Sequence, residues 1–138
     1  MKALLLFCPL LFGVTGCTQD ALCSNDVQQV ARDPGSDRYA ATLVRNCGAT
    51  TDYATVVRVG RASEAQSAVK EVFVADTDHG AATRGAQGAI WTSVVWTAPG
   101  KLSIAYAKDA RVYRQKDHAK GATISFLKSG PMAAPQVD

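Results

Sequence analysis

Alternation of apolar and polar residues is the clearest pattern in this chain, and it begins near Arg38. Seven short runs rich in β-branched and aromatic residues lie between there and residue 128, at 39–44, 53–59, 69–75, 90–96, 102–107, 110–114 and 122–127. Alternation with a period of two, in residues of these types, is typical of half-buried strands. The pattern predicts an all-β domain, a single antiparallel meander or sandwich-like fold of about seven short strands.

The breaks between the runs contain residues typical of turns. Gly48–Asp52 is a plausible hairpin loop, and Thr97–Gly100 places Pro and Gly where a type II turn accepts them. Asp76–Gly88 differs from these breaks because it is long, polar and rich in glycine. Irregular segments of this length are usually either mobile or functional.

The first sixteen residues have the composition of a secretory signal. Lys2 supplies a positive charge, and an apolar run from Ala3 to Val14 follows it. The run is shorter than the roughly 20 residues that a membrane-spanning helix needs, and Pro9 weakens such a helix further. A cleaved signal peptide at residues 1–16 is therefore expected.

The expected cleavage site, Val14-Thr15-Gly16-Cys17, resembles the lipobox of bacterial lipoproteins. The resemblance implies that the Cys17 thiol receives a diacylglycerol, that the signal is cut before Cys17, and that the new amine is acylated. It also implies that Thr18, where an Asp commonly signals retention at the inner membrane, favours transport to the outer membrane in a two-membrane cell. The lipid bilayer is then the first expected partner, because several acyl chains anchor a protein firmly.

The cysteines fit an exported protein. Of the four, Cys8 leaves with the signal and Cys17 carries lipid, so that Cys23 and Cys47 remain. In an oxidising compartment these two are expected to form a disulfide. The alternatives are two free thiols or a metal-binding pair, and the chain has neither a Cys-x-x-Cys motif nor a histidine near either cysteine.

The mature chain is long enough for one domain. Removal of residues 1–16 leaves 122 of the 138 residues and lowers the formal net charge from +3 to +2. We expect a lipidated tether at 17–36, partly held by the disulfide and with a helical turn or two at Asp26–Arg32. The β domain follows at 37–128, and the tail 129–138 shows no core pattern and is expected to be disordered. Lys and Arg are scattered, which argues against nucleic acid as a partner.

Candidate chemistry is sparse. Asp76-Thr77-Asp78-His79-Gly80 has alternating aspartates as in calcium loops, yet the later acids of an EF-hand are missing, and a turn capped by Asp side chains is the simpler interpretation. A metal or acid–base site would need the fold to bring His79 and His118 together with these acids. No serine lies in a Gly-x-Ser-x-Gly elbow. We therefore expect a protein that is not an enzyme and has no cofactor or metal.

Trp91 and Trp96 are the candidate binding residues. Strand alternation sends them to opposite faces of the predicted run 90–96, so one of them is expected on the less buried side. Aromatic residues at strand spacing are more often part of the core. An exposed Trp would be the natural anchor for a partner.

The segment Arg45–Thr51, with its Asn-Cys-Gly-Ala-Thr-Thr sequence, resembles a group of small uncharacterised bacterial lipoproteins with a β-rich domain. The resemblance supports the domain and the disulfide but implies no activity. The first functional hypothesis is a non-enzymatic, lipid-anchored binding module of the cell envelope, directed at a protein or peptidoglycan-related partner in the manner of hydrolase inhibitors and immunity proteins. The alternatives are a structural accessory subunit of an envelope complex and, less favoured, a metal-binding or hydrolytic enzyme using Asp76–His79.

Overall fold

All seven predicted runs form strands, and two further strands join them. The structure is a computed structural model that describes residues 22–48 and 50–130. The predicted signal peptide 1–16, Cys17 and the predicted tail 129–138 lie outside the described residues, apart from Ser129 and Gly130, and Ser129 is part of a strand. The described strands are β1 (Ser24–Arg32), β2 (Arg38–Asn46), β3 (Ala54–Arg61), β4 (Lys70–Asp76), β5 (Thr92–Ala98), β6 (Lys101–Ala107), β7 (Arg111–Gln115), β8 (His118–Ala119) and β9 (Ala122–Ser129).

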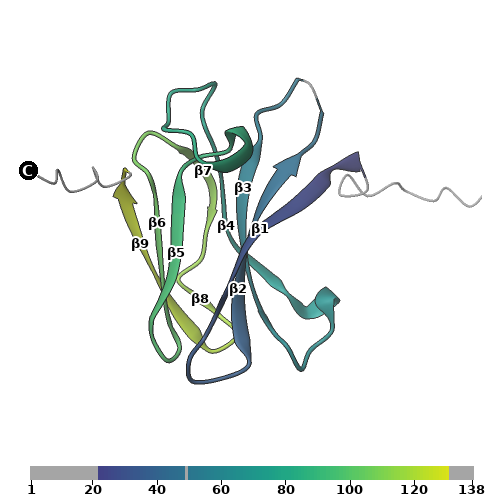
Figure 1. Ribbon diagram of the computed structural model, residues 1–138, viewed down its shortest axis with the longest axis vertical. Helices are drawn as coiled ribbons and strands as arrows, with labels where there is room; N and C mark the ends of the chain where they lie inside the picture. The colour runs from purple at the N-terminus through teal and green to yellow at the C-terminus, as the bar shows by residue number, and fades with distance from the viewer. Residues whose placement is uncertain (1–21, 49, 131–138) are drawn as a thin grey trace, which may run out of the picture.

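The strands form two facing sheets (Figure 1). The larger sheet has the order β1-β2-β3-β4-β7 and is antiparallel throughout. The smaller sheet has the order β5-β6-β9-β8, and its central pair, β6 and β9, is parallel. The fold is therefore all-β, as predicted, but an antiparallel meander describes only β1 to β4. In a meander each strand pairs with the next strand along the chain. Here the chain passes from β6 in the smaller sheet to β7, which pairs with β4 in the larger sheet.

The N-terminal segment differs most from the sequence prediction. Ser24–Arg32, expected as tether or helical turn, is strand β1, paired with β2 from Ser24 opposite Asn46 to Arg32 opposite Tyr39. Eight of its nine side chains are exposed, Ala31 being half-buried. The strand is therefore held by backbone pairing, and its polar sequence lacks the alternation that marks a half-buried strand.

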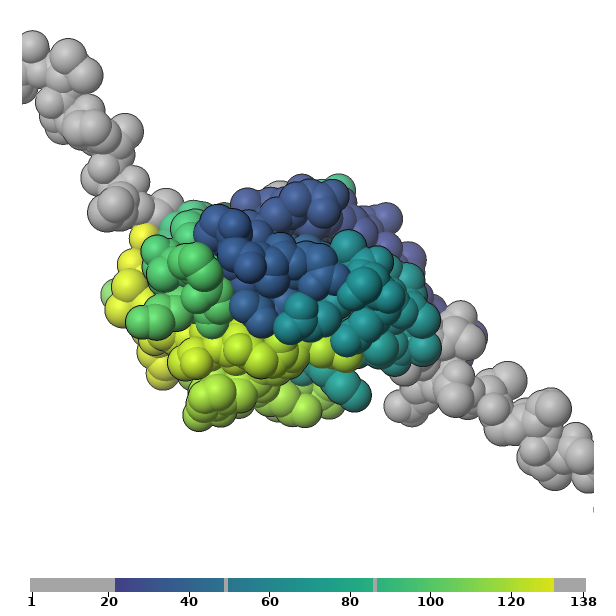
Figure 2. All heavy atoms as spheres, turned by 90° about the horizontal axis from the view of Figure 1, so that it is seen from below, coloured from purple at the N-terminus to yellow at the C-terminus, as the bar shows by residue number. Residues whose placement is uncertain are grey.

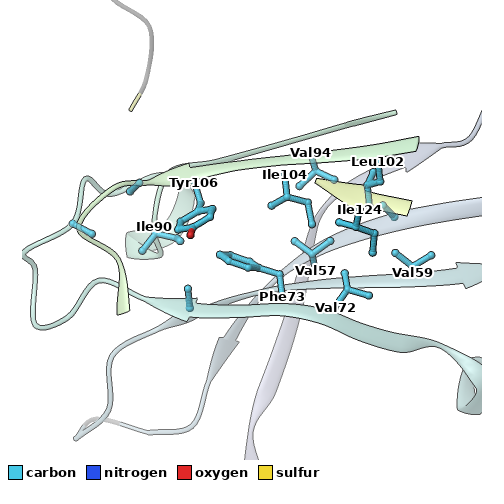
Figure 3. Packing of buried hydrophobic residues seen from close by; sticks show 14 residues of the cluster. Val57, Val59, Val72, Phe73, Ile90, Val94, Leu102, Ile104, Tyr106 and Ile124 are labelled. Carbon is cyan, nitrogen blue, oxygen red and sulfur yellow. The ribbon is translucent and has the colours of Figure 1, made fainter. Parts of the chain in front are cut away.

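The main core lies between the sheets (Figure 3). The pairing of β3 with β4 contains a β-bulge, where the register shifts between Val57 and Arg58. This bulge turns both Val72 and Phe73 of β4 inward, and both are fully buried. The Phe73 ring lies 4.9 Å from that of Tyr106, centroid to centroid, in the facing sheet. Burying side chains of this size contributes about 1.5–3 kcal/mol each, so the contact between β4 and β6 is a principal attachment of the two layers.

The sandwich has two ends with different contacts. We call one the disulfide end, after the Cys23–Cys47 bond, and the other the latch end, after a carboxylate that joins turns of the two sheets. The disulfide end, at the top of Figure 1, carries the loops 47–53 and 77–91. The latch end, at the bottom of that view, carries the turns 33–37, 62–69, 99–100 and 120–121.

At the latch end, turns from both sheets meet. Figure 2 shows this end with the turns of the two sheets side by side. The buried Asp33 carboxylate accepts hydrogen bonds from Arg38 Nε at 2.8 Å and Gly35 N at 2.9 Å in its own sheet, and from Gly100 N at 3.1 Å in the other. One carboxylate thus fastens the β1–β2 turn to the β5–β6 turn.

Candidate functional site

The predicted disulfide is present and organises one end of the larger sheet. Cys23 and Cys47 are bonded, with their Cα atoms 4.2 Å apart. The bond joins the start of β1 to the loop that follows β2, so both partners belong to the same sheet. The prediction of a Cys23–Cys47 disulfide is confirmed.

Two hollows open at the disulfide end, on either side of the loop that contains Thr51 and Asp52. The first encloses about 440 Å³ and reaches Asn46 and Arg84. The second encloses about 330 Å³ and reaches Arg45, Arg111 and the loop residue His79. Because Thr51 and Asp52 line both, the loop after the disulfide separates them.

Asp76, the last residue of β4, lies at the centre of an ion-pair cluster beside the second hollow. Arg111 donates to both of its oxygens, from Nε at 3.2 Å and from Nη2 at 2.7 Å. Tyr113 donates its hydroxyl to Asp76 Oδ2 at 2.7 Å. Arg111 and Tyr113 come from β7, which pairs with β4, so the register of this pair places all three side chains together.

These contacts fix the charge states. Burial alone would raise the pKa of Asp76, but the hydrogen bonds from Arg111 and Tyr113 outweigh it and lower the pKa. Hydrogen bonding to Asp76 raises the pKa of Arg111, and it also raises the pKa of Tyr113, whose proton it holds. Asp76 therefore anchors β7 as an ionised carboxylate at neutral pH.

The predicted Asp76–Gly80 turn is tightly coiled. Asp78, His79 and Gly80 have positive φ angles of 48°, 57° and 92°. Asp78 N donates to Asp76 Oδ1 at 2.9 Å, as expected for a turn capped by an Asp side chain. His79 N donates to Asp52 Oδ2 at 2.7 Å, which ties the turn to the loop that carries the disulfide.

Arg111 occupies the position where a bound cation would gather these acids. Its guanidinium lies 3.3 Å from Asp78 Oδ1 and 3.9 Å from Asp52 Oδ2, in addition to its bonds to Asp76. Within 22–48 and 50–130 no group of three or more His, Cys, Asp or Glu side chains is arranged to hold a metal ion. His118 lies in β8 at the latch end, beside Asp117 at 3.0 Å, so the fold does not bring the two histidines together.

Trp91 and Trp96 both pack, half-buried, against the main core. Their expected placement on opposite faces is wrong, because β5 begins at Thr92 and Trp91 precedes the alternating run. Trp96 donates its indole N–H to the Ala31 carbonyl at 3.0 Å and so bridges from β5 to β1. A binding role for either residue stays a prediction.

A second charged cluster, which the sequence did not indicate, covers the outer face of the larger sheet. Arg45, Arg58 and Arg114 come from three strands and all donate to Glu71, at 3.0 Å from Arg58 Nη2 and 3.2 Å from Arg114 Nη1. Beneath them, Val56 is fully buried although it points away from the smaller sheet. The arginine stems therefore shield a small apolar cluster, as long charged side chains often do.

Glu71 is ionised when it accepts the hydrogen bonds of these three arginines. Its burial favours a raised pKa, but the hydrogen bonds from Arg45 and Arg58 prevail, and the pKa of Glu71 is lowered. Three guanidinium groups against one carboxylate leave an excess of positive charge within this cluster. The one signal in the sequence was an arginine inside an apolar run, such as Arg58 between two valines.

Comparison of the chain with models of protein families, with curated protein sequences and with solved structures finds no match in any of the three. Among the described residues, no helix is long and apolar enough to cross a membrane.

Proposed function

We propose that this chain is a lipoprotein of the cell envelope, anchored through acylated Cys17, whose β-sandwich serves as a non-enzymatic binding module. The lipobox-like sequence before Cys17 and the resemblance around Arg45–Thr51 support the anchor. Thr18 favours the outer membrane, with the domain facing the periplasm. The partner is an envelope protein, of the kind that inhibitors or immunity proteins of cell-wall hydrolases bind.

The geometry at the N-terminal side suits a short anchor. Four residues separate Cys17 from Leu22, where the described structure begins. An extended chain spans at most about 3.6 Å per residue, so the lipid would lie within roughly 20 Å of Cys23. The disulfide fixes this attachment to β2, and the disulfide end would therefore lie near the bilayer.

The observation that carries the proposal is the uncovered outer face of the larger sheet. The smaller sheet packs on the inner face, yet the outer face holds its own apolar cluster and exposes Val27 and Val30 on β1. Exposed apolar side chains beside organised charges are typical of surfaces that bind other proteins. The carboxylates of the Asp76–His79 segment are engaged in structural contacts, which favours binding over catalysis.

The anchor is tested by mass spectrometry of the native protein and of Cys17→Ala. The expected native product begins at Cys17, carries acyl mass and remains with membranes, whereas the variant is recovered without acyl mass. A native product that begins at Met1 or lacks acyl groups would contradict the anchor.

The binding role is tested by cross-linking the native protein in envelopes and purifying its complexes. One stoichiometric soluble hydrolase supports the binding module, whereas a membrane complex supports the alternative of an accessory subunit. A variant that combines Asp76→Asn, Asp78→Asn and His79→Gln tests catalysis. Loss of a cellular phenotype with folding and binding intact would favour the enzyme hypothesis instead.

A further inference from the structure

A shallow groove lies on the outer face where β1 and β2 approach the latch end. It encloses about 310 Å³, and its walls include Val27 and Val30 of β1, Tyr39 and Ala41 of β2, and Arg32. Val27 is 59% exposed and Val30 is 49% exposed, so the apolar walls are open to solvent.

A close approach between strands shapes the floor of this groove. The Tyr39 side chain lies across Gly60 of β3, where an added Cβ would come within 2.7 Å of the tyrosine hydroxyl. The hydroxyl in turn accepts a hydrogen bond from Gln66 Nε2 at 3.2 Å. Glycine at position 60 thus permits the ring to lie flat against the sheet, and the groove is built into the fold.

The charges around the groove are unbalanced. Arg32 makes no ion pair with any residue in the described part of the chain, and no carboxylate lines the groove there. Ala41 pairs across the strands with Arg58, which belongs to the cluster in which Glu71 serves three arginines. Apolar walls are therefore flanked by one unpaired guanidinium on β1 and by an excess of guanidinium groups on β2, β3 and β7.

We propose that this outer face, from the β1–β2 groove to the Arg45–Arg58–Arg114 cluster, is the docking surface for a segment of a partner protein rich in aliphatic and acidic side chains. The inference rests on the proposed binding function and specifies where and what the module binds. Aliphatic side chains of the segment fill the groove and remove Val27 and Val30 from water. Its carboxylates pair with Arg32 and with the guanidinium groups that Glu71 leaves uncompensated.

Two observations favour a protein segment over other anionic partners. Most of the groove lining is apolar, from Val27, Val30, Tyr39, Ala41 and Ala62, so it favours aliphatic side chains over the hydroxyls of a sugar. The groove and the arginine cluster lie on neighbouring strands, about 4.8 Å apart per strand. One segment crossing the strands therefore meets both features in succession.

The test measures binding of a short Leu/Glu peptide to the purified native protein by calorimetry, with the contact surface mapped by hydrogen exchange. The comparison probes are a Leu/Lys peptide of the same length, poly-glutamate, and vesicles that contain anionic phospholipid. Val30→Asp and Arg32→Glu change the groove at exposed positions. Val95→Asp and Lys101→Glu are matched controls, because Val95 is 51% exposed and Lys101 is exposed on the other sheet.

The expected result is that the Leu/Glu peptide binds, protects β1 and β2, and loses affinity about tenfold in each groove variant, or roughly 1.4 kcal/mol, with no change in the controls. Absence of binding, equal loss in the controls, or equal affinity for the Leu/Lys peptide would overturn the proposal. Equally tight binding of poly-glutamate would overturn the proposal that aliphatic side chains of the partner fill the groove. Vesicle binding that is weakened by the groove variants would identify a lipid surface as the occupant. If the partner captured from envelopes binds the groove variants unchanged, the docking surface is wrong while the binding function stands.

Discussion

The two ends of the sandwich are held by different interactions. One end is held within a single sheet, which affects local stability, and the other is held between the sheets, which affects the stability of the whole domain. The disulfide at one end joins β1 to the loop after β2, neighbours in the same sheet. At the other end, the Asp33 carboxylate joins turns from both sheets. A covalent bond thus holds an exposed edge strand, whereas a buried carboxylate holds the two layers together.

Both ends also contain an ionised acid that bonds to arginine, with different consequences. Asp76 ties β7 to β4 within the larger sheet. At the latch end, Arg38 and Arg61 also reach the Lys120 carbonyl, at 3.4 Å each, and so attach the larger sheet to the β8–β9 turn. Loss of a latch contact is therefore expected to affect the whole domain, and loss of a disulfide-end contact a part of it.

The largest expected effect is at the latch. Asp33→Ala leaves the Arg38 guanidinium and two backbone N–H groups without their acceptor, which costs about 3–5 kcal/mol of unfolding free energy. Urea denaturation measures the loss, with Asp109→Ala on the exposed β6–β7 turn as the control. A loss below about 1 kcal/mol would show that the layers do not depend on this carboxylate.

A smaller and more local effect is expected at the disulfide. Cys23→Ser with Cys47→Ser lowers the unfolding free energy by about 2–3 kcal/mol. Because β1 buries little of its surface, hydrogen exchange should increase mainly in β1 and at the end of β2. An equal increase in β5 and β6 would contradict the division between the two ends.

Tyr113→Phe removes one hydrogen bond to Asp76 and leaves the Arg111 pair in place. The expected loss is about 1 kcal/mol, since the tyrosine is largely exposed. Tyr53→Phe is the matched control, because the Tyr53 hydroxyl makes no hydrogen bond to any described residue. Equal changes in the two variants would show that the hydrogen bond from Tyr113 to Asp76 does not stabilise the disulfide end.

The smallest effect concerns acid sensitivity at the latch end. Hydrogen bonds from the Ser63 side chain and backbone, and then from Arg61, lower the pKa of Asp37 from 3.8 to about 2. A carboxylate whose pKa is lowered by folding stabilises the fold at pH values above its pKa in the unfolded chain. This contribution is lost as the pH falls from about 3.8 to about 2. Asp37→Asn lacks the contribution, so its stability should fall less steeply over this interval. Parallel curves for wild type and variant in chemical denaturation would contradict the assignment.

The sequence predicted seven strands with at least partly buried side chains and missed two, the exposed edge strand β1 and the two-residue β8. β2 to β4 are rich in apolar residues because each buries side chains in the core, and β2 and β3 do so on both faces. β1 reads Ser-Asn-Asp-Val-Gln-Gln-Val-Ala-Arg, and as an edge strand with exposed side chains it receives its order from pairing with β2. Local patterns also do not specify which strands become neighbours, and for that reason the parallel β6–β9 pair was not predicted.

The candidate site was predictable only where neighbours in sequence act together. The capped turn after β4 follows from Asp76 and Asp78, which are two residues apart. Arg111 is 35 residues from Asp76, and the three arginines around Glu71 come from three strands, so their meeting depends on register and bulges. The same holds for Tyr39 and Gly60, whose contact shapes the groove.

The central position of β9 constrains the order in which the domain can fold. The smaller sheet keeps β6 and β9 at its centre, and β9 is the last strand among the described residues. Until residues 122–129 have been added to the sheet, β6 lacks its parallel neighbour and Leu102 its cross-strand partner Ile124. The larger sheet can pair its first four strands in the order of the chain, but completion of the smaller sheet waits for β9. A chaperone that shields β5 and β6 during this interval would act on the half of the molecule that is completed last.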